Sequence, residues 1–295
     1  MSAAASPFPE IFQPEEIYKD HFRFNGPETK WKRVYGGLVI SQALAAATRT
    51  VSSDRNVHSL HAYFLLPGDP AAPIVCAVDR LRDGRSFSTR YCRAIQYDQT
   101  IFALTASYHV EEPGFEHMTP MPNVPPPEEL ENFAALQHRL RPGAARHYFE
   151  YFAGDRPIEF RPVDPDRFFP ESGLRSPDAV QTAWFRAIVP LVDDRAIHEC
   201  VLAYASDMTL LDSTLIAHGR SVTDGSVQPA SLDHSIWYHR NFRADEWLLF
   251  IQDSPNSGHA RGLAIGRIYM RDGTLIATVA QEGLIRPRRP PAPQS

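Results

Sequence analysis

The chain has 295 residues, of which 43% are hydrophobic and 22% are charged, and its formal net charge is −5. This length predicts about two domains, and the negative charge argues against nucleic acid as a partner. The three cysteines, Cys76, Cys92 and Cys200, are widely spaced and indicate neither a disulfide framework nor a zinc site. No segment is as long and apolar as a membrane span, and the N-terminus lacks a signal-peptide pattern. We therefore expect a cytoplasmic protein.

The first half of the chain predicts one helix followed by a run of antiparallel strands. Residues 34–51 carry apolar side chains at the spacing of a helix face, and Gly36 and Gly37 lie at the start of this segment. Segments rich in β-branched and aromatic residues follow, separated by turn sequences at 67–70 and 82–85. The predicted strands cover residues 57–66, 74–81, 87–96 and 100–110.

The second half predicts the same order of elements. We expect a helix from Ser206 to Gly219, with Ser206 as its N-cap and Asp207 in its first turn. A proline-rich connector that begins at Pro113 separates the halves, and residues 127–140 permit a helix. The predicted strands of the second half cover residues 182–189, 229–239, 247–253, 260–270 and 274–286.

The two halves also align with each other at a shift that drifts only from 171 to 174 residues. This alignment places His61 against His234 and indicates duplication and fusion of one unit. A single unit with one apolar helix would leave an edge of its sheet unpaired, and joining two units edge to edge removes that edge. The sequence therefore predicts one continuous antiparallel sheet that carries two helices. The aligned segments are 34–51 with 205–222, 59–64 with 232–237 and 99–107 with 273–281.

Several motifs occur in this order over most of residues 31–286, and their combined order is more specific than any one of them. They include RVYGG at 33–37, VHSLHAYFL at 57–65, RDGRSFS at 82–88, SLDHSIWYHR at 231–240 and QEG at 281–283. With these motifs, the chain resembles the type II acyl-CoA thioesterases, the double-hotdog family. The resemblance implies an α+β fold of two hotdog repeats, each a central helix wrapped by an antiparallel sheet.

The predicted division of the chain follows from the repeats and the connector. We expect an N-terminal hotdog over 1–112, a proline-rich linker with a possible helix over 113–180 and a C-terminal hotdog over 181–286. Residues 287–295, with four prolines, are expected to form a disordered tail. By analogy with other hotdog sheets, we expect a homo-oligomer, either a dimer or a tetramer.

The resemblance further implies hydrolysis of acyl-CoA by a water molecule held between an aspartate, a Ser/Thr hydroxyl and a glutamine, with no cofactor. These positions fall on Asp207, Ser231 and Gln281. The family usually has Gln and Gly where this chain has Leu38 and Ser41, which predicts an altered acyl-chain preference. Many relatives carry Thr in place of Ser231, and both residues supply a hydroxyl.

The repeat alignment gives a separate argument for these three residues. An aspartate can accept a proton from water, while a hydroxyl and an amide orient the molecule, and backbone amides at a helix start can receive the thioester oxygen. The candidate amides are those of Gly36, Gly37 and the start of the second helix. The first repeat has different residues at all three aligned positions, which predicts one active site per chain. Those residues are Gly36, His58 and Ser107.

Alternative roles stay open at this stage. Asp207 in a first helical turn could serve only to stabilise the helix, and the chain could be a non-catalytic acyl-CoA-binding hotdog protein. Ser231 has no Gly-x-Ser-x-Gly surroundings, which disfavours a covalent nucleophile. An acyl-CoA dehydratase needs a histidine on the reacting helix, and residues 208–216 contain none. His61 and His234 occur in both repeats, which favours a scaffold role, whereas the role of His58 stays open.

Overall fold

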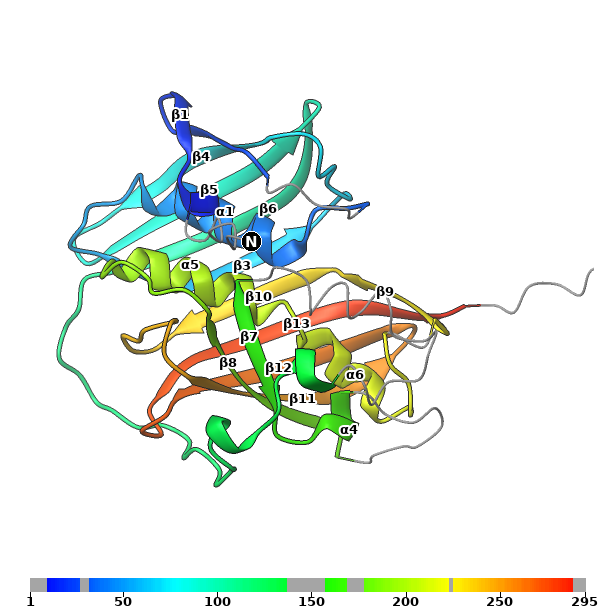
Figure 1. Ribbon diagram of the computed structural model, residues 1–295. Helices are drawn as coiled ribbons and strands as arrows, with labels where there is room; N and C mark the ends of the chain where they lie inside the picture. Colours follow the sequence, from blue (N-terminus) through cyan, green and yellow to red (C-terminus); the bar gives the residue numbers. More distant parts are fainter. Residues whose placement is uncertain (1–9, 27–31, 137–156, 169–177, 223–224, 289–295) are drawn as a thin grey trace, which may run out of the picture.

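The computed structural model describes residues 10–26, 32–136, 157–168, 178–222 and 225–288 (Figure 1). The elements of the first half are η1 (Glu10–Phe12), β1 (Glu15–Tyr18), β2 (His21–Phe24), α1 (Gly36–Thr48), β3 (Asn56–Phe64), β4 (Ile74–Asp83), β5 (Phe87–Gln96) and β6 (Gln99–His109). The short elements that follow are η2 (Pro127–Glu129), α2 (Phe133–Leu136), β7 (Ile158–Pro162) and α4 (Pro165–Phe168). The second half contains β8 (Val180–Ala187), α5 (Arg195–Ser206), η4 (Leu210–Asp212), α6 (Ser213–Ile216), β9 (Val227–Ser231), β10 (Asp233–Tyr238), β11 (Leu248–Gly258), β12 (Arg261–Met270) and β13 (Leu275–Pro287).

Over the described residues, the strands form one 13-stranded sheet in the order β1-β2-β4-β5-β6-β3-β10-β13-β12-β11-β8-β7, and β9 pairs with β13 off this path. The two halves meet where β3 pairs antiparallel with β10, with Leu60 opposite Ile236 and Ala62 opposite His234. All four of these side chains are buried. The predicted α+β double hotdog, with one continuous sheet, is therefore confirmed.

The two long helices α1 and α5 pack against each other and against one face of the sheet, which we call the inner face. In α1, every residue from Gly37 to Ala47 is buried, because one side of the helix meets the sheet and another meets α5. A helix that is apolar on all sides suits such a position. The contact is close: the Tyr35 hydroxyl donates a hydrogen bond to the Tyr204 carbonyl oxygen at 2.7 Å.

The long predicted strands of both halves are observed with boundaries shifted by a few residues. The predicted strand at 229–239 is divided at Leu232 into β9 and β10, and β1, β2 and β7 were not predicted. The strand β7 lies within the segment that the sequence assigns to the linker. The predicted disordered tail over 287–295 begins too early, because Pro287 still pairs with Val227 at the end of β13, and from residue 289 onward the tail lies outside the described residues. The predicted helix over 127–140 is described only to residue 136.

The predicted helix from Ser206 to Gly219 is wrong. The long helix α5 comes earlier and ends at Ser206, with Asp207 as its C-cap; only η4 and α6 follow. Asp194 caps the N-terminus of α5, where its side chain accepts a hydrogen bond from the Ala196 amide at 3.0 Å. Asp207 therefore lies at the end of a helix rather than in a first turn.

The repeat alignment was also wrong by one residue along the strands. His61 is exposed and contacts the Ser235 hydroxyl at 3.1 Å, whereas His234 is fully buried on the inner face. Side chains alternate between the faces of a strand, so an error of one residue exchanges the faces. The same error pairs the inward-facing Gln281 with Ser107, which faces outward between the buried Ala106 and Tyr108.

The proline-rich connector covers part of the outer face of the second half. Its residues Met121, Val124 and Leu130 pack against buried side chains that include Trp184. The Trp184 indole Nε1 donates a hydrogen bond to the Pro125 carbonyl oxygen at 2.9 Å. None of the helices in the described ranges is long and apolar enough to cross a lipid bilayer.

Substituting Gly37 tests the close packing of α1 on α5. A Cβ at this position would overlap the backbone oxygen of Tyr204, which cannot move without shifting α5. We expect Gly37→Ala to lower the free energy of unfolding by about 1–3 kcal/mol, as overpacked sites do. Gly114→Ala is the matched control because nothing lies within 4 Å of the added Cβ. Urea unfolding of both variants measures the difference, and equal stability would contradict the close helix contact.

Candidate active site

Asp207 lies where the C-terminal end of α5 meets the N-terminal end of α1. Its side chain is only 6% exposed. The backbone amide of Gly37 donates a hydrogen bond to its carboxylate, and a Cβ at Gly36 would lie 2.6 Å from its Oδ2. Glycine at position 36 lets the start of α1 approach the carboxylate directly, and glycine at position 37 lets it approach the backbone of α5. The unpaired amides of a first helical turn are suited to hold such an anion.

Gln281 projects from β13 onto the inner face and is fully buried. Its Nε2 donates a hydrogen bond of 2.6 Å to Oδ1 of Asp207. The side-chain oxygen Oε1 of Gln281 is buried and has no hydrogen-bond partner among the described residues. The structure thus brings two of the three predicted site residues into direct contact.

Ser231, the third predicted residue, ends β9 and lies opposite Gly283 in the pairing of β9 with β13. Gly283 is two residues beyond Gln281 and faces the same side of the sheet. Ser231 is half-buried, and its hydroxyl makes no hydrogen bond to either Asp207 or Gln281 within the described residues. It therefore lies beside the contacting pair, on the neighbouring strand.

The turn after Asp207 is held to the sheet by a buried polar network. Gln181 Nε2 donates a hydrogen bond to the Thr209 carbonyl oxygen at 2.7 Å. The Thr209 hydroxyl in turn donates to Gln252 Oε1 at 2.9 Å. Because Gln181 and Gln252 lie on the paired strands β8 and β11, these bonds fix the chain two residues beyond the carboxylate.

Burial raises the pKa of Asp207 to about 7. The hydrogen bonds from Gln281 and from the Gly37 amide oppose this shift because they stabilise the ionised form, but the loss of hydration is the larger effect. A carboxylate with this pKa binds a proton more tightly than an exposed aspartate does. It is therefore suited to remove a proton from a bound molecule near neutral pH.

His234 is a site residue that the sequence argument missed. It is fully buried, its Nε2 lies 2.9 Å from the Ser206 hydroxyl, and its Nδ1 lies 4.0 Å from Oδ1 of Asp207. Burial lowers its pKa to about 3, so the ring is neutral at ordinary pH. The apparent match with His61 concealed it. The sequence signal was the alternation of Asp233 and Ser235 with His234 and Ile236, which places His234 on the same face as the apolar Ile236.

Other predicted candidates lie elsewhere. His58 is on the outer face, where its Nε2 contacts the Ser107 hydroxyl at 2.8 Å. The start of the second helix is at Arg195, at the opposite end of α5 from Asp207, so it is not an oxyanion donor. The Gly37 amide is bonded to Asp207, which leaves Gly36 as the predicted donor. The turn at 82–85 is tied to Arg55 and Arg90 rather than to Asp207.

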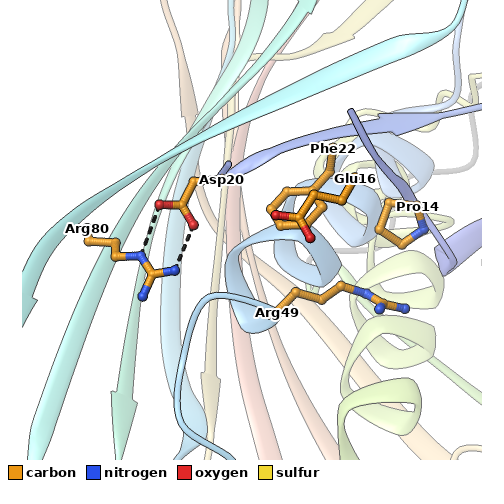
Figure 2. A pocket seen from close by; sticks show the side chains of 6 residues that line it. All are labelled: Pro14, Glu16, Asp20, Phe22, Arg49 and Arg80. Carbon is orange, nitrogen blue, oxygen red and sulfur yellow. Dashed lines mark hydrogen bonds and ion pairs between the residues drawn. The ribbon is translucent and has the colours of Figure 1, made fainter. Parts of the chain in front are cut away.

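A surface hollow of about 210 Å³ lies beside Arg49, at the opposite end of α1 from Asp207 (Figure 2). Asp20 and Arg80, which line it, form an ion pair at 2.7 Å. The hollow contains none of the predicted site residues. Within the described ranges, no group of three or more His, Cys, Asp or Glu side chains is arranged to hold a metal ion.

Known proteins resemble this chain over most of its length. A family model described as acyl-CoA thioesterase N-terminal domain matches residues 27–109, and one described as acyl-CoA thioesterase matches residues 149–284. Acyl-CoA thioesterase 2 of Haemophilus influenzae is 40% identical over 276 residues, which cover 94% of this chain and 96% of the relative.

Solved structures with a similar fold include members of the same family. The crystal structure of an acyl-CoA thioesterase II from Mycobacterium marinum matches with a TM-score of 0.78 and 39% identity, over 95% of this chain and 98% of that chain. A protein with a hot dog fold from Alicyclobacillus acidocaldarius, at 20% identity, matches with a TM-score of 0.69 over 91% of this chain and 94% of that chain.

The raised pKa of Asp207 predicts a pH-dependent gain in stability for Asp207→Asn. An unfolded aspartate ionises near pH 3.8, whereas the folded one keeps its proton to about pH 7, so the wild type loses stability as the pH rises through this window. The asparagine keeps a side-chain oxygen for Gln281 and cannot ionise. We expect the variant to be more stable by about 2–4 kcal/mol at pH 8, with the difference vanishing toward pH 4.

Urea unfolding of the wild type and Asp207→Asn at several pH values measures this difference. A difference that does not change with pH would show that the carboxylate titrates with the same pKa in the folded and unfolded states.

Proposed function

This chain belongs to the acyl-CoA thioesterase family and is a thioester hydrolase, and we propose that it converts fatty-acyl-CoA and water to a free fatty acid and CoA at Asp207. The observation that carries this assignment is the 2.6 Å hydrogen bond from Gln281 to a carboxylate whose pKa burial raises to about 7. Asp207 is the general base, and Gln281 and Ser231 orient the attacking water. The position of Ser231 next to Gly283 supports its part in this set.

The reaction needs only one proton carrier. Asp207 takes one proton from the water, and the water oxygen forms a bond to the thioester carbon. The carbonyl oxygen becomes an oxyanion, which receives hydrogen bonds at the start of α1, where the Gly36 amide is the proposed donor. When the intermediate collapses, the carbon–sulfur bond breaks, and the proton held by Asp207 passes to the departing thiolate of CoA. The carboxylate is then ready for another turnover.

The acyl chain would lie along apolar residues beside the site, with the CoA nucleotide outside. A small apolar cluster lies next to the site, beyond Gln281 on β13 and beyond Asp207 along the chain. It consists of Leu211, Leu215, Val227 and Ile285. Leu211 packs onto Gly283, where an added Cβ would overlap Cδ1 of Leu211. On the facing helix, Leu38 and Ser41 are buried near its start and are the proposed source of a distinct chain-length preference.

We also infer that the protein works in the cytoplasm as a homo-oligomer of two or four chains. Its three cysteines are free thiols, as is usual in a reducing compartment. On the outer face of the β3–β10 junction, Tyr63 and Trp237 are exposed. Aromatic side chains of this kind are enriched in contacts between protein chains, which supports association through this face.

The central test is the release of free thiol from acyl-CoAs of several chain lengths. We expect Asp207→Asn to lower kcat by at least about 100-fold, because the amide cannot accept the proton. In the wild type, kcat/KM should fall as the pH drops below about 7, since protonation of Asp207 removes the base. Undiminished hydrolysis by a folded Asp207→Asn variant would contradict the mechanism. Absence of hydrolysis by the wild type at every chain length would favour a non-catalytic acyl-CoA-binding protein.

Gln281→Leu tests the hydrogen bond to the base. Because this bond lowers the pKa of Asp207, its loss should raise that pKa further, and the acid limb of kcat/KM should move to higher pH. We also expect kcat to fall by roughly 10–100-fold, since the water loses one orienting group. Gln96→Leu is the matched control, because this buried glutamine bonds to residues 69–73 instead. An acid limb that stays in place, or moves to lower pH, would contradict the role of Gln281.

A further inference from the structure

Two buried polar side-chain atoms near Asp207 have no hydrogen-bond partner among the described residues. They are Oε1 of Gln281 and Nδ1 of His234. Leaving a buried polar atom unsatisfied costs about 1–3 kcal/mol, so such atoms in a native site call for a ligand. Both belong to side chains that contact or approach Asp207. A water molecule can satisfy an unpaired acceptor at this place because it donates two hydrogen bonds.

The hydrogen bonds of Ser206 favour one tautomer of His234. The Ser206 hydroxyl donates its only hydrogen to the Ala203 carbonyl oxygen at 3.0 Å. With that hydrogen on Ala203, the hydroxyl accepts at its 2.9 Å contact with Nε2 of His234, and on this basis we assign the ring proton to Nε2. In a neutral ring, Nδ1 then carries a lone pair and is an acceptor. The end of α5 thus favours one tautomer of a residue on β10.

The distance between His234 and Asp207 fits a shared water molecule. Nδ1 lies 4.0 Å from Oδ1 of Asp207, which is too long for a direct hydrogen bond. Two acceptors that bind the two hydrogens of one water lie roughly 4–5 Å apart, given ordinary hydrogen-bond lengths. A carboxylate oxygen and an imidazole lone pair are therefore placed to hold one water between them.

We propose that His234 is a further catalytic residue, whose Nδ1 accepts a hydrogen bond from the nucleophilic water while Asp207 accepts the other hydrogen. This inference rests on the proposed function. As Asp207 removes one proton, the second O–H bond of the water stays intact and remains bonded to Nδ1, so no proton passes to the ring. With both hydrogens held, a lone pair of the water oxygen is directed away from the two acceptors and toward the thioester carbon. His234 thus orients the nucleophile without titrating.

The matched variants His234→Asn and His234→Gln separate this role from a structural one. Asparagine places its side-chain oxygen near the position of Nδ1, whereas glutamine reaches the position of Nε2 and keeps the contact with Ser206. If Nδ1 holds the water, His234→Asn retains kcat within about 5-fold, and His234→Gln loses about 10–100-fold, with KM unchanged in both. If the Ser206 contact is what matters, His234→Gln is at least as active as His234→Asn, or both activities follow Tm. Either of those results overturns the proposal.

A measurement on the wild type keeps the proposal testable if a variant fails to fold. In protein with ¹⁵N-labelled histidine, we expect the NMR signal of His234 to show a protonated Nε2 and an unprotonated Nδ1. A protonated Nδ1 would overturn the proposal, because that nitrogen could not accept a hydrogen bond. Asp207→Asn is assayed in parallel. Full activity of Asp207→Asn would refute the proposed function itself. If Asp207→Asn is inactive but His234→Gln is fully active, only the role of His234 is refuted.

Discussion

A carboxylate buried between the start of one helix and the end of another is the feature on which the rest of this structure depends. Asp207 caps the C-terminus of α5, and Gly36 lets α1 approach it without a side chain in between. The loss of hydration at this contact raises the pKa of the carboxyl group, while the bonds from Gln281 and the Gly37 amide keep the anion in place. Without the helix contact, the aspartate would be solvated and would be a weaker base.

The sheet that joins the two halves makes the contact between Asp207 and the start of α1 possible. The opposite end of the helix pair has different residues. The pairing of β3 with β10 joins the halves and holds α1 beside α5. The two helices have different C-caps, Asp207 on α5 and Arg49 on α1. Next to Arg49, the buried Arg90 donates hydrogen bonds to the hydroxyl and carbonyl oxygens of Thr50. That end of the structure is filled by a guanidinium group, which supports one reactive centre per chain.

Sequence reasoning predicted the continuous sheet and the first central helix, because strand alternation and helix periodicity are local signals, and the family resemblance placed Asp207 and Gln281 in one site. The second central helix was misplaced. Sequence reasoning failed where the outcome depended on packing. The helix α5, which ends before Asp207, is buried on nearly every side, although it contains polar residues such as Glu199. Because of these polar residues, the sequence argument did not predict a buried helix there. The repeat alignment matched residue types but not sheet faces, so His234 was paired with the exposed His61 and its approach to Asp207 was missed. Residue spacing does not specify how side chains are placed. The sequence therefore could not show which buried polar atoms lack a hydrogen-bond partner.

In the proposed mechanism, the site loses stability in favour of reactivity, because the ionised carboxylate that acts as the base is the form that burial disfavours. The most direct test of this account is the pKa of Asp207 itself. Carboxyl-region infrared difference spectra of the wild type against Asp207→Asn, recorded as the pH is varied, isolate the protonation of this one group. The account predicts a midpoint near pH 7. A midpoint near 3.8, the value for an unperturbed aspartate, would contradict the claim that burial between the two helices prepares Asp207 as the base.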